Sequence, residues 1–303
     1  MSILVVGSVA LDTVETPFGK VDNSLGGSAV YFSVSASYFT PVKLVAVIGE
    51  DFPQKHINLL HKHHVDTTGL QKVKGKTFRW KGHYMHDLNQ AQTLDTQLNV
   101  FANFSPELPE KYKNSDVVFL ANIDPVLQRK VLAQVKKPKL VACDTMNFWI
   151  ESKREELIKT LKLVDILVIN EGEARQLAKE ANLVKAAKTI FKWGLKALVV
   201  KRGEYGALFF TPKHVFSSPA FPLENVVDPT GAGDTFAGGF MGYLAQCSTH
   251  NDCNLHRAMI FGSVMASFNV EDFSLNRLTR LNKKEINKRF EQFKKLTHFD
   301  LLK

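Results

Sequence analysis

Residues 226–240 read VVDPTGAGDTFAGGF, and this stretch says more about the fold than any other part of the chain. Gly231 and Gly233 remove side chains where a helix over residues 230–246 begins, so unpaired backbone N–H groups can approach an anion. The helix dipole favours negative charge at the same point, so we predict a phosphate site. Asp234 falls in the first turn, where a carboxylate either caps the helix or points at a nucleophile beside the phosphate.

Short, nearly continuous runs of Val, Ile and Leu precede this stretch, as expected of parallel strands buried on both faces. Helical patterns lie between several of them, which predicts an α/β fold with a mostly parallel sheet covered by helices. The expected strands are residues 3–6, 44–48, 117–120, 140–143, 166–169 and 197–200, and the expected helices are 28–39, 54–63, 126–135, 153–161, 171–179, 184–193, 230–246, 254–268 and 284–296.

Two stretches depart from this alternation of strands and helices. Polar and apolar residues nearly alternate over residues 70–104, which is typical of antiparallel, half-exposed strands. Together with residues 11–18 this stretch predicts a small sheet projecting from the core. No repeat or linker rich in Pro, Gly and Ser separates the parts, so we expect one domain over residues 1–303. Its core would be residues 1–8, 24–67 and 105–303, with an insertion at residues 9–23 and 68–104.

The composition is that of an ordinary globular protein, with 303 residues, 45% of them hydrophobic and 23% charged. The apolar run in the first twelve residues is too short for a signal peptide, and no later segment offers about 18 apolar residues for a membrane span. The cysteines Cys143, Cys247 and Cys253 form no CxxC pair. We therefore expect a cytoplasmic protein without a disulfide framework or a membrane partner.

A net charge of +9 admits nucleic acid as a partner. The basic residues cluster weakly, in residues 72–81 and 283–289, and the second cluster reads as the solvated face of a helix. We expect no nucleic acid, since attraction of small anionic substrates explains the same charge.

Several familiar patterns are missing. The chain has no GxxxxGK[ST] loop, no GxGxxG after its first strand and no HExxH. The absent glycine-rich first turn argues against a dinucleotide-dependent oxidoreductase. His56, His61, His63 and His64 have the spacing of a polar helix end rather than of a metal site.

The segment DPTGAGDTFAGGF resembles the C-terminal signature of the ribokinase-like, or PfkB, family of carbohydrate and nucleoside kinases. The resemblance implies a ribokinase-like fold in which the inserted sheet is a lid over the substrate, and it implies ATP as the phosphoryl donor. It assigns Gly231, Ala232 and Gly233 to the anion hole of the transferring phosphate and Asp234 to the catalytic base.

Elements in the N-terminal part of the chain extend the resemblance. LGGSA at residues 25–29 resembles the family's diglycine element, where Gly26 and Gly27 bring a helix start close to the substrate. Asp12 matches the family aspartate that bonds substrate hydroxyls. Read without the family, the glycines form a turn and Asp12 is a turn residue after the first strand.

Residues for the nucleotide and its ions come from the second half of the chain. Asn170 and Glu173 match the NxxE motif that organises Mg²⁺ and its waters, although Glu173 is also a good first-turn helix residue. Asp228 and Thr230 match positions that bind K⁺ in some relatives. In the same resemblance, KRGEYGA places Lys201, Gly203 and Gly206 beside the nucleotide, and residues 261–272 close over the adenine.

The chain departs from ribokinases proper at two substrate positions, where Ala10 and Tyr31 replace asparagines. The loss of two amides argues against ribose itself, because hydroxyls are discriminated by such partners. Tyr31 either stacks on a base or sugar or packs in the core.

The acceptor stays open among sugars, sugar phosphates and nucleosides. We expect an ATP-dependent kinase acting on a hydroxyl of a small sugar-like substrate, with an adenosine-like nucleoside kinase and a non-catalytic ligand-binding relative as alternatives. The resemblance also allows a homodimer formed through the lid.

Overall fold

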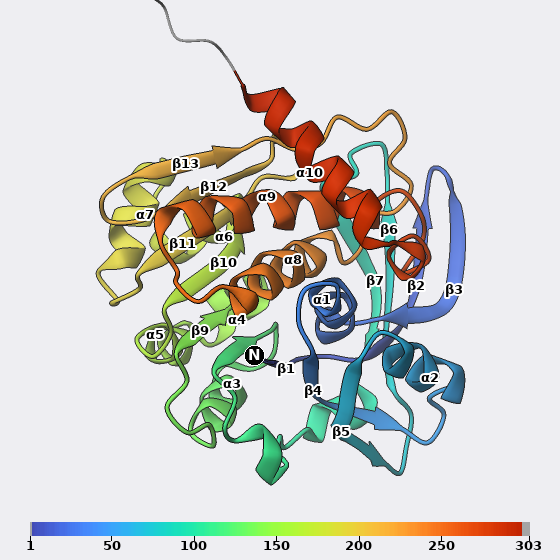
Figure 1. Ribbon diagram of the computed structural model, residues 1–303. Helices are drawn as coiled ribbons and strands as arrows, with labels where there is room; N and C mark the ends of the chain where they lie inside the picture. The colour runs from blue at the N-terminus through green and yellow to red at the C-terminus, as the bar shows by residue number, and fades with distance from the viewer. Residues whose placement is uncertain (1, 299–303) are drawn as a thin grey trace, which may run out of the picture.

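Two sheets organise the structure, a computed structural model that describes residues 2–298 (Figure 1). Within those residues the larger sheet has nine strands in the order β13-β12-β11-β10-β9-β8-β1-β4-β5. Its seven strands from β11 to β5 pair in parallel, and β12 and β13 add an antiparallel edge. The strands are β1 Ile3–Val6, β4 Val42–Gly49, β5 Val65–Val73, β8 Val117–Leu120, β9 Leu140–Cys143, β10 Ile166–Asn170, β11 Ala197–Lys201, β12 Ala207–Phe210 and β13 Val215–Ser218.

The central strands are apolar at every position because both faces of the sheet are covered. All residues of β1, β8 and β9 are buried. Alternate side chains of a strand point to opposite faces, so Ile3 and Val5 join one hydrophobic cluster while Leu4 and Val6 join the other.

Helices supply the cover on each face. Figure 1 shows α8 and α9 lying across one face, and the hydrophobic cluster there also includes side chains of α1, α2 and α10. Helices α3 to α7 contribute to the other cluster. The predicted α/β fold with a mostly parallel sheet is confirmed. The helices are α1 Ser28–Ser37, α2 Gln54–Lys62, α3 Pro125–Leu132, α4 Asn147–Ser152, α5 Arg154–Leu161, α6 Glu171–Ala178, α7 Leu183–Phe191, α8 Ala232–Gln246, α9 Asp252–Asn269 and α10 Lys283–Thr297.

The smaller sheet projects beside the larger one, on the side of β4 and β5 in Figure 1. Its four strands run in the order β3-β2-β6-β7, and they are β2 Ala10–Thr16, β3 Gly19–Gly26, β6 Phe78–Tyr84 and β7 Ala91–Gln97. The pairs β2/β3 and β6/β7 are antiparallel hairpins, whereas β2 and β6 pair in parallel. Strands β2 and β6 follow β1 and β5, which point the same way in the larger sheet, so both leave that sheet in one direction.

The alternating stretch also holds a strand of the larger sheet. Residues 68–73, which we assigned to the inserted sheet, lie in β5 and pair with β4. The burial of β5 varies along its length because it is the edge strand. An edge strand exposes part of its surface, and for that reason its sequence resembles that of the inserted sheet.

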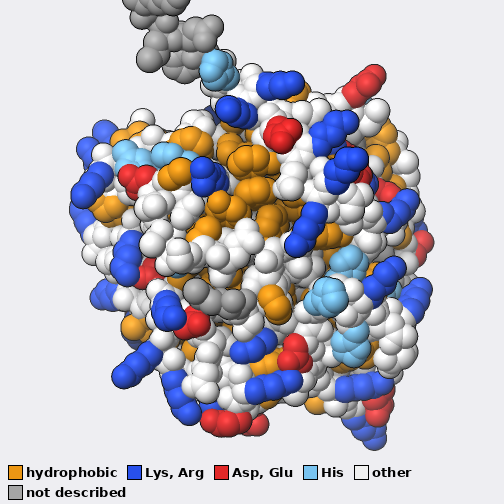
Figure 2. Space-filling model, viewed as in Figure 1, with side chains coloured by type: hydrophobic (Ala, Val, Ile, Leu, Met, Phe, Trp, Pro, Cys, Tyr) orange, Lys and Arg blue, Asp and Glu red, His pale blue; other side chains and the backbone are white. Residues whose placement is uncertain are grey.

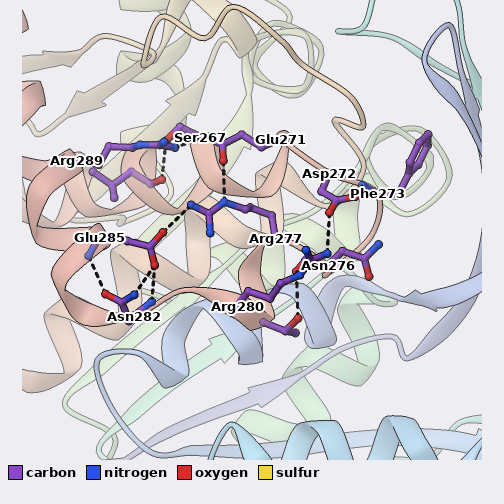
Figure 3. Close-up of polar contacts among 12 residues, drawn as sticks. Ser267, Glu271, Asp272, Phe273, Asn276, Arg277, Arg280, Asn282, Glu285 and Arg289 are labelled. Atoms are coloured by element: carbon purple, nitrogen blue, oxygen red, sulfur yellow. Dashed lines mark hydrogen bonds and ion pairs between the residues drawn. The ribbon is translucent and has the colours of Figure 1, made fainter.

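A polar network fixes the segment between α9 and α10 (Figure 3). The guanidinium of Arg277 donates to Glu271 at 2.8 Å and to Glu285 at 2.9 Å. Arg289 of α10 pairs with Glu271 at 2.7 Å and lies 3.5 Å from the centre of the Phe268 ring. These contacts fix the position of the loop that carries Ser274. The backbone N–H of Ser274 donates to Asp228 at the candidate active site.

The surface in Figure 2 carries Lys and Arg side chains dispersed among acidic ones, with hydrophobic side chains gathered in its upper centre. On this face the positive charge therefore forms no single patch. Among residues 2–298, no helix has both the length and the hydrophobicity that crossing a bilayer requires.

Candidate active site

The candidate site lies where the carboxyl ends of the parallel strands meet the start of α8. In open α/β sheets, ligands bind outside these strand ends at the point where the strand order reverses. Here β1 pairs with β4 on one side and β8 on the other, so the reversal falls at β1. Asp12 follows β1 in the chain, and Asp144, Asn170 and Lys201 end or follow β9, β10 and β11.

The glycine turn before α8 is held by a buried carboxylate. Asp228 is 0% exposed, and its two oxygens accept the backbone N–H groups of Thr230 at 2.9 Å and of Ser274 at 3.1 Å. Gly231 then adopts φ +73°, a conformation that favours glycine, and caps α8. The N–H of Ala232 donates to the Pro229 carbonyl at 3.1 Å, so that group is already engaged within the turn.

Tyr31 lies directly behind this turn. A Cβ on Gly231 would sit 2.4 Å from the Tyr31 ring, and the tyrosine is only 2% exposed. Its hydroxyl shares a hydrogen bond with Ser274. Of the two roles left open by the sequence, these contacts favour packing in the core over stacking on a ligand.

Asp12 explains the pair of glycines. Its carboxylate lies on Gly26, where a Cβ would come within 1.8 Å of Oδ2, and it accepts the N–H of Gly27. Burial raises the pKa of Asp12 to about 7, and the charges of Asp228 and Asp234 act in the same direction. The three aspartates therefore share one electrostatic environment, although Asp12 comes from the N-terminal part of the chain and the other two flank the start of α8.

A second group of charges surrounds Asp234. Burial raises the pKa of this carboxyl to about 6, and the ammonium of Lys201 opposes the rise. Glu173 also has a raised pKa from burial, again opposed by Lys201. Asn170 and Glu173 form a reciprocal helix cap, with two side chain to backbone hydrogen bonds of 2.8 Å.

Asp144 belongs to the same group and escaped the sequence analysis. It is 4% exposed, and its Oδ1 has no hydrogen-bond partner among the described residues. Burial raises its pKa well above the ordinary value, and the nearby charge of Asp234 adds to the effect. The available signal was its position directly after a buried strand, the same position that Lys201 and Asn170 hold at the ends of theirs.

The donor atoms fit a magnesium ion. Mg²⁺ takes oxygen ligands and keeps several waters, and the unpartnered oxygen of Asp144 beside Glu173 supplies such ligands. No cluster of three or more metal-binding side chains occurs in residues 2–298. An ion held here would therefore depend on water and on a bound nucleotide for its remaining ligands.

A pocket of about 660 Å³ opens next to the start of α8. It brings together five residues expected to contact the nucleotide or its phosphates, namely Lys201, Gly203, Gly206, Ala232 and Gly233. Asn170 and Glu173 do not line it. The loop between β6 and β7 forms part of its wall, and Asn89 in that loop donates to Glu204 at 3.4 Å.

Tyr84 is a second residue that the sequence analysis missed. It ends β6 of the smaller sheet, and its buried hydroxyl accepts a hydrogen bond of 3.3 Å from the Thr230 hydroxyl. Burial raises the pKa of Tyr84 to about 12. The contact joins the smaller sheet to the glycine turn.

A glycine turn at a helix start, an aspartate in the first turn of that helix and the buried Asp12 nearby, all at the carboxyl ends of a parallel sheet, fit a small-molecule kinase. The family model described as pfkB family carbohydrate kinase matches residues 2–280, and the chain belongs to that family. It is a phosphotransferase of the carbohydrate and nucleoside kinase type, as the resemblance implied.

Individual relatives agree with this placement. A cytidine kinase of Thermococcus kodakarensis is 33% identical over 259 residues, covering 84% of this chain and 92% of that protein. The solved nucleoside kinase of Methanocaldococcus jannaschii has a TM-score of 0.78 at 21% identity and covers 96% of this chain and 98% of its own. An Escherichia coli protein of this fold, solved with ATP and Mg²⁺, has a TM-score of 0.79 at 18% identity, covering 96% and 99%.

The position of Tyr31 generates a prediction. Tyr31→Ala should lower the free energy of unfolding by roughly 3–5 kcal/mol, the usual range for truncating a buried aromatic ring. Tyr31→Phe keeps the ring behind Gly231 and should lose much less. Denaturant titration of both variants measures the difference. A stable alanine variant with altered acceptor preference would instead place the ring against the substrate.

Proposed function

We propose that this chain transfers the γ-phosphoryl group of ATP to a hydroxyl of a nucleoside. The observation that carries this proposal is the 33% identity with a cytidine kinase over 84% of the chain. The residues first suggested a sugar-like acceptor. The buried Tyr31 and the small Ala10 stand where ribokinases proper have amides for a sugar, which supports a different acceptor.

In the proposed mechanism Asp234 acts as the general base. Its carboxylate takes the proton of the acceptor hydroxyl, the oxygen attacks the γ-phosphorus, and the bond to the bridging oxygen breaks to release ADP. The start of α8 stabilises the negative charge that develops, through the N–H groups of Gly231 and Gly233 and through the helix dipole, since the N–H of Ala232 is bonded to Pro229. The raised pKa of Asp234, about 6, suits a base that must hold a proton during the reaction.

Asp12 orients the acceptor by accepting hydrogen bonds from its hydroxyls, with Gly26 and Gly27 allowing the close approach. Lys201, Gly203 and Gly206 hold the nucleotide in the pocket beside the turn. Asp144, together with Glu173 positioned by Asn170, would hold Mg²⁺ through its waters. Bound Mg²⁺ would neutralise charge on the nucleotide phosphates.

The smaller sheet acts as a lid that excludes water from the reacting groups. Support comes from Tyr84, because its hydrogen bond with Thr230 connects this sheet to the turn that holds the phosphate. The lid would comprise residues 9–26 and 74–104 of a single kinase domain, since residues 68–73 belong to β5.

Asp234→Asn tests the function. The variant should fold and bind ATP through the backbone N–H groups but lose roughly 10²- to 10⁴-fold in turnover, the contribution of a positioned base. ADP formation over a panel of nucleosides and sugars, with calorimetric ATP binding, measures both. In the unsubstituted protein, kcat/KM should fall as the pH drops below about 6, because the base of the free enzyme then becomes protonated.

The control for that variant is Asp252→Asn, which changes an exposed carboxylate in the first turn of α9 and should leave turnover unchanged. Normal turnover in folded Asp234→Asn would remove the base from the mechanism. A panel in which sugars are phosphorylated and nucleosides are not would overturn the choice of acceptor.

Glu173→Gln should raise the Mg²⁺ concentration needed for half-maximal rate, because the amide holds metal-bound water more weakly than a carboxylate. The cap with Asn170 survives, since glutamine keeps an acceptor oxygen. Glu171→Gln, in the same first turn of α6, serves as the control. An unchanged Mg²⁺ dependence of the rate would rule out this role.

Potassium is a further proposal, with Asp228 and Thr230 contributing to the site. Both Asp228 oxygens already accept backbone N–H groups and keep lone pairs for an ion. Activity should rise when KCl replaces an equal concentration of tetramethylammonium chloride. Equal rates in the two salts would exclude the ion.

A further inference from the structure

Lys201 holds an unusual place at the end of β11. Its side chain lies along the first turn of α8, where a Cβ on Gly233 would be 2.8 Å from Nζ and 3.6 Å from Cε. Any larger residue at this position would force the ammonium away. The sequence thus leaves room for Nζ at the point where backbone N–H groups face a phosphate.

The groups that surround this ammonium are the carboxyls of the candidate active site. Asp144, Glu173 and Asp234 all feel its field, and for each it is the strongest influence that favours the ionised form. Yet Lys201 makes no ion pair within 4.0 Å among residues 2–298. Lys196, directly before the first residue of β11, shows the contrast by pairing with Asp165 at 2.7 Å.

An ammonium that lines the pocket of about 660 Å³ beside α8 without a paired carboxylate is free to bind an anion there. In phosphoryl transfer, charge spreads over the three equatorial oxygens of the transferring group, and cations placed beside them stabilise the transition state. Backbone N–H groups alone carry only partial charges. A full positive charge at the same turn stabilises the negative charge of the transferring group more strongly than these partial charges do.

We propose that Lys201 is a catalytic residue whose ammonium contacts the transferring phosphoryl group beside Gly233. This inference rests on the proposed phosphoryl transfer and assigns a specific residue to the stabilisation of its charge. The competing role is structural, in which Lys201 only offsets the charges of the three neighbouring carboxyls. The two roles differ in what the ammonium does when the γ-phosphate is absent.

The test compares two nucleotides on the whole protein. Lys201→Met should bind the non-hydrolysable β,γ-imido analogue of ATP about tenfold or more weakly, while ADP affinity changes less than about threefold. Turnover should fall about 10²- to 10³-fold, as when one donor to a developing charge is removed. Lys201→Arg, which keeps the charge, should recover part of both losses. Calorimetry, turnover and thermal melting are measured for each variant.

Lys196→Met is the matched control, because it removes an exposed lysine at the other end of β11, just before the strand begins, and should change neither nucleotide affinity nor turnover. If the methionine variant does not fold, Lys201→Gln gives the same comparison with a polar side chain. Equal weakening for both nucleotides, or turnover near that of the unsubstituted protein, would overturn the role of Lys201. Failure of the unsubstituted protein to phosphorylate any acceptor would overturn the proposed function instead. The comparison of the two nucleotides would still show whether the Lys201 ammonium contacts the γ-phosphate.

Discussion

The buried carboxylate of Asp228 is the contact on which the arrangement of the site depends. It joins the N–H of Thr230 to that of Ser274, two residues far apart in the chain, and it has no exposed surface. A buried carboxylate is tolerated only when its oxygens are hydrogen-bonded, so this position couples the glycine turn to the loop before α10. The ion pairs of Arg277 and Arg289 hold that loop against α9 and α10 (Figure 3).

Close approach explains the glycines better than chain flexibility does. At Gly26, Gly231 and Gly233 the missing Cβ leaves space for the Asp12 carboxylate, the Tyr31 ring and the Lys201 ammonium. Three different elements thereby contact the backbone of the two motifs that the sequence analysis selected. Each glycine in these motifs allows one particular side chain to contact the backbone. The motifs therefore constrain the positions of residues elsewhere in the chain.

The sequence predicted the sheet well because its signal is local. Continuous apolar runs mark strands buried on both faces, and β1, β8 and β9 match the predicted ranges residue for residue. Strands β12 and β13 and helix α4 were not predicted, since elements of only four to six residues are too short to show a clear periodicity. Asp144 and Tyr84 were missed because only the meeting of distant elements gives them a role. The same limit applied to Tyr31. Its position in the sequence allowed either stacking on a ligand or packing in the core, and its burial favours packing in the core.

The charges of the site point to a ligand that carries both signs. If Asp144, Glu173 and Asp234 are all ionised beside Lys201, three carboxylates and one ammonium leave two negative charges uncompensated. Desolvation is the main cause of the raised pKa of all three carboxyls, and repulsion among the carboxylates adds to the rise at Asp144 and Glu173. A divalent cation compensates the excess, and the ammonium then becomes available to a phosphate. A nucleotide with its metal ion brings both partners at once, so its binding would further favour the ionised form of Asp234 that a base requires.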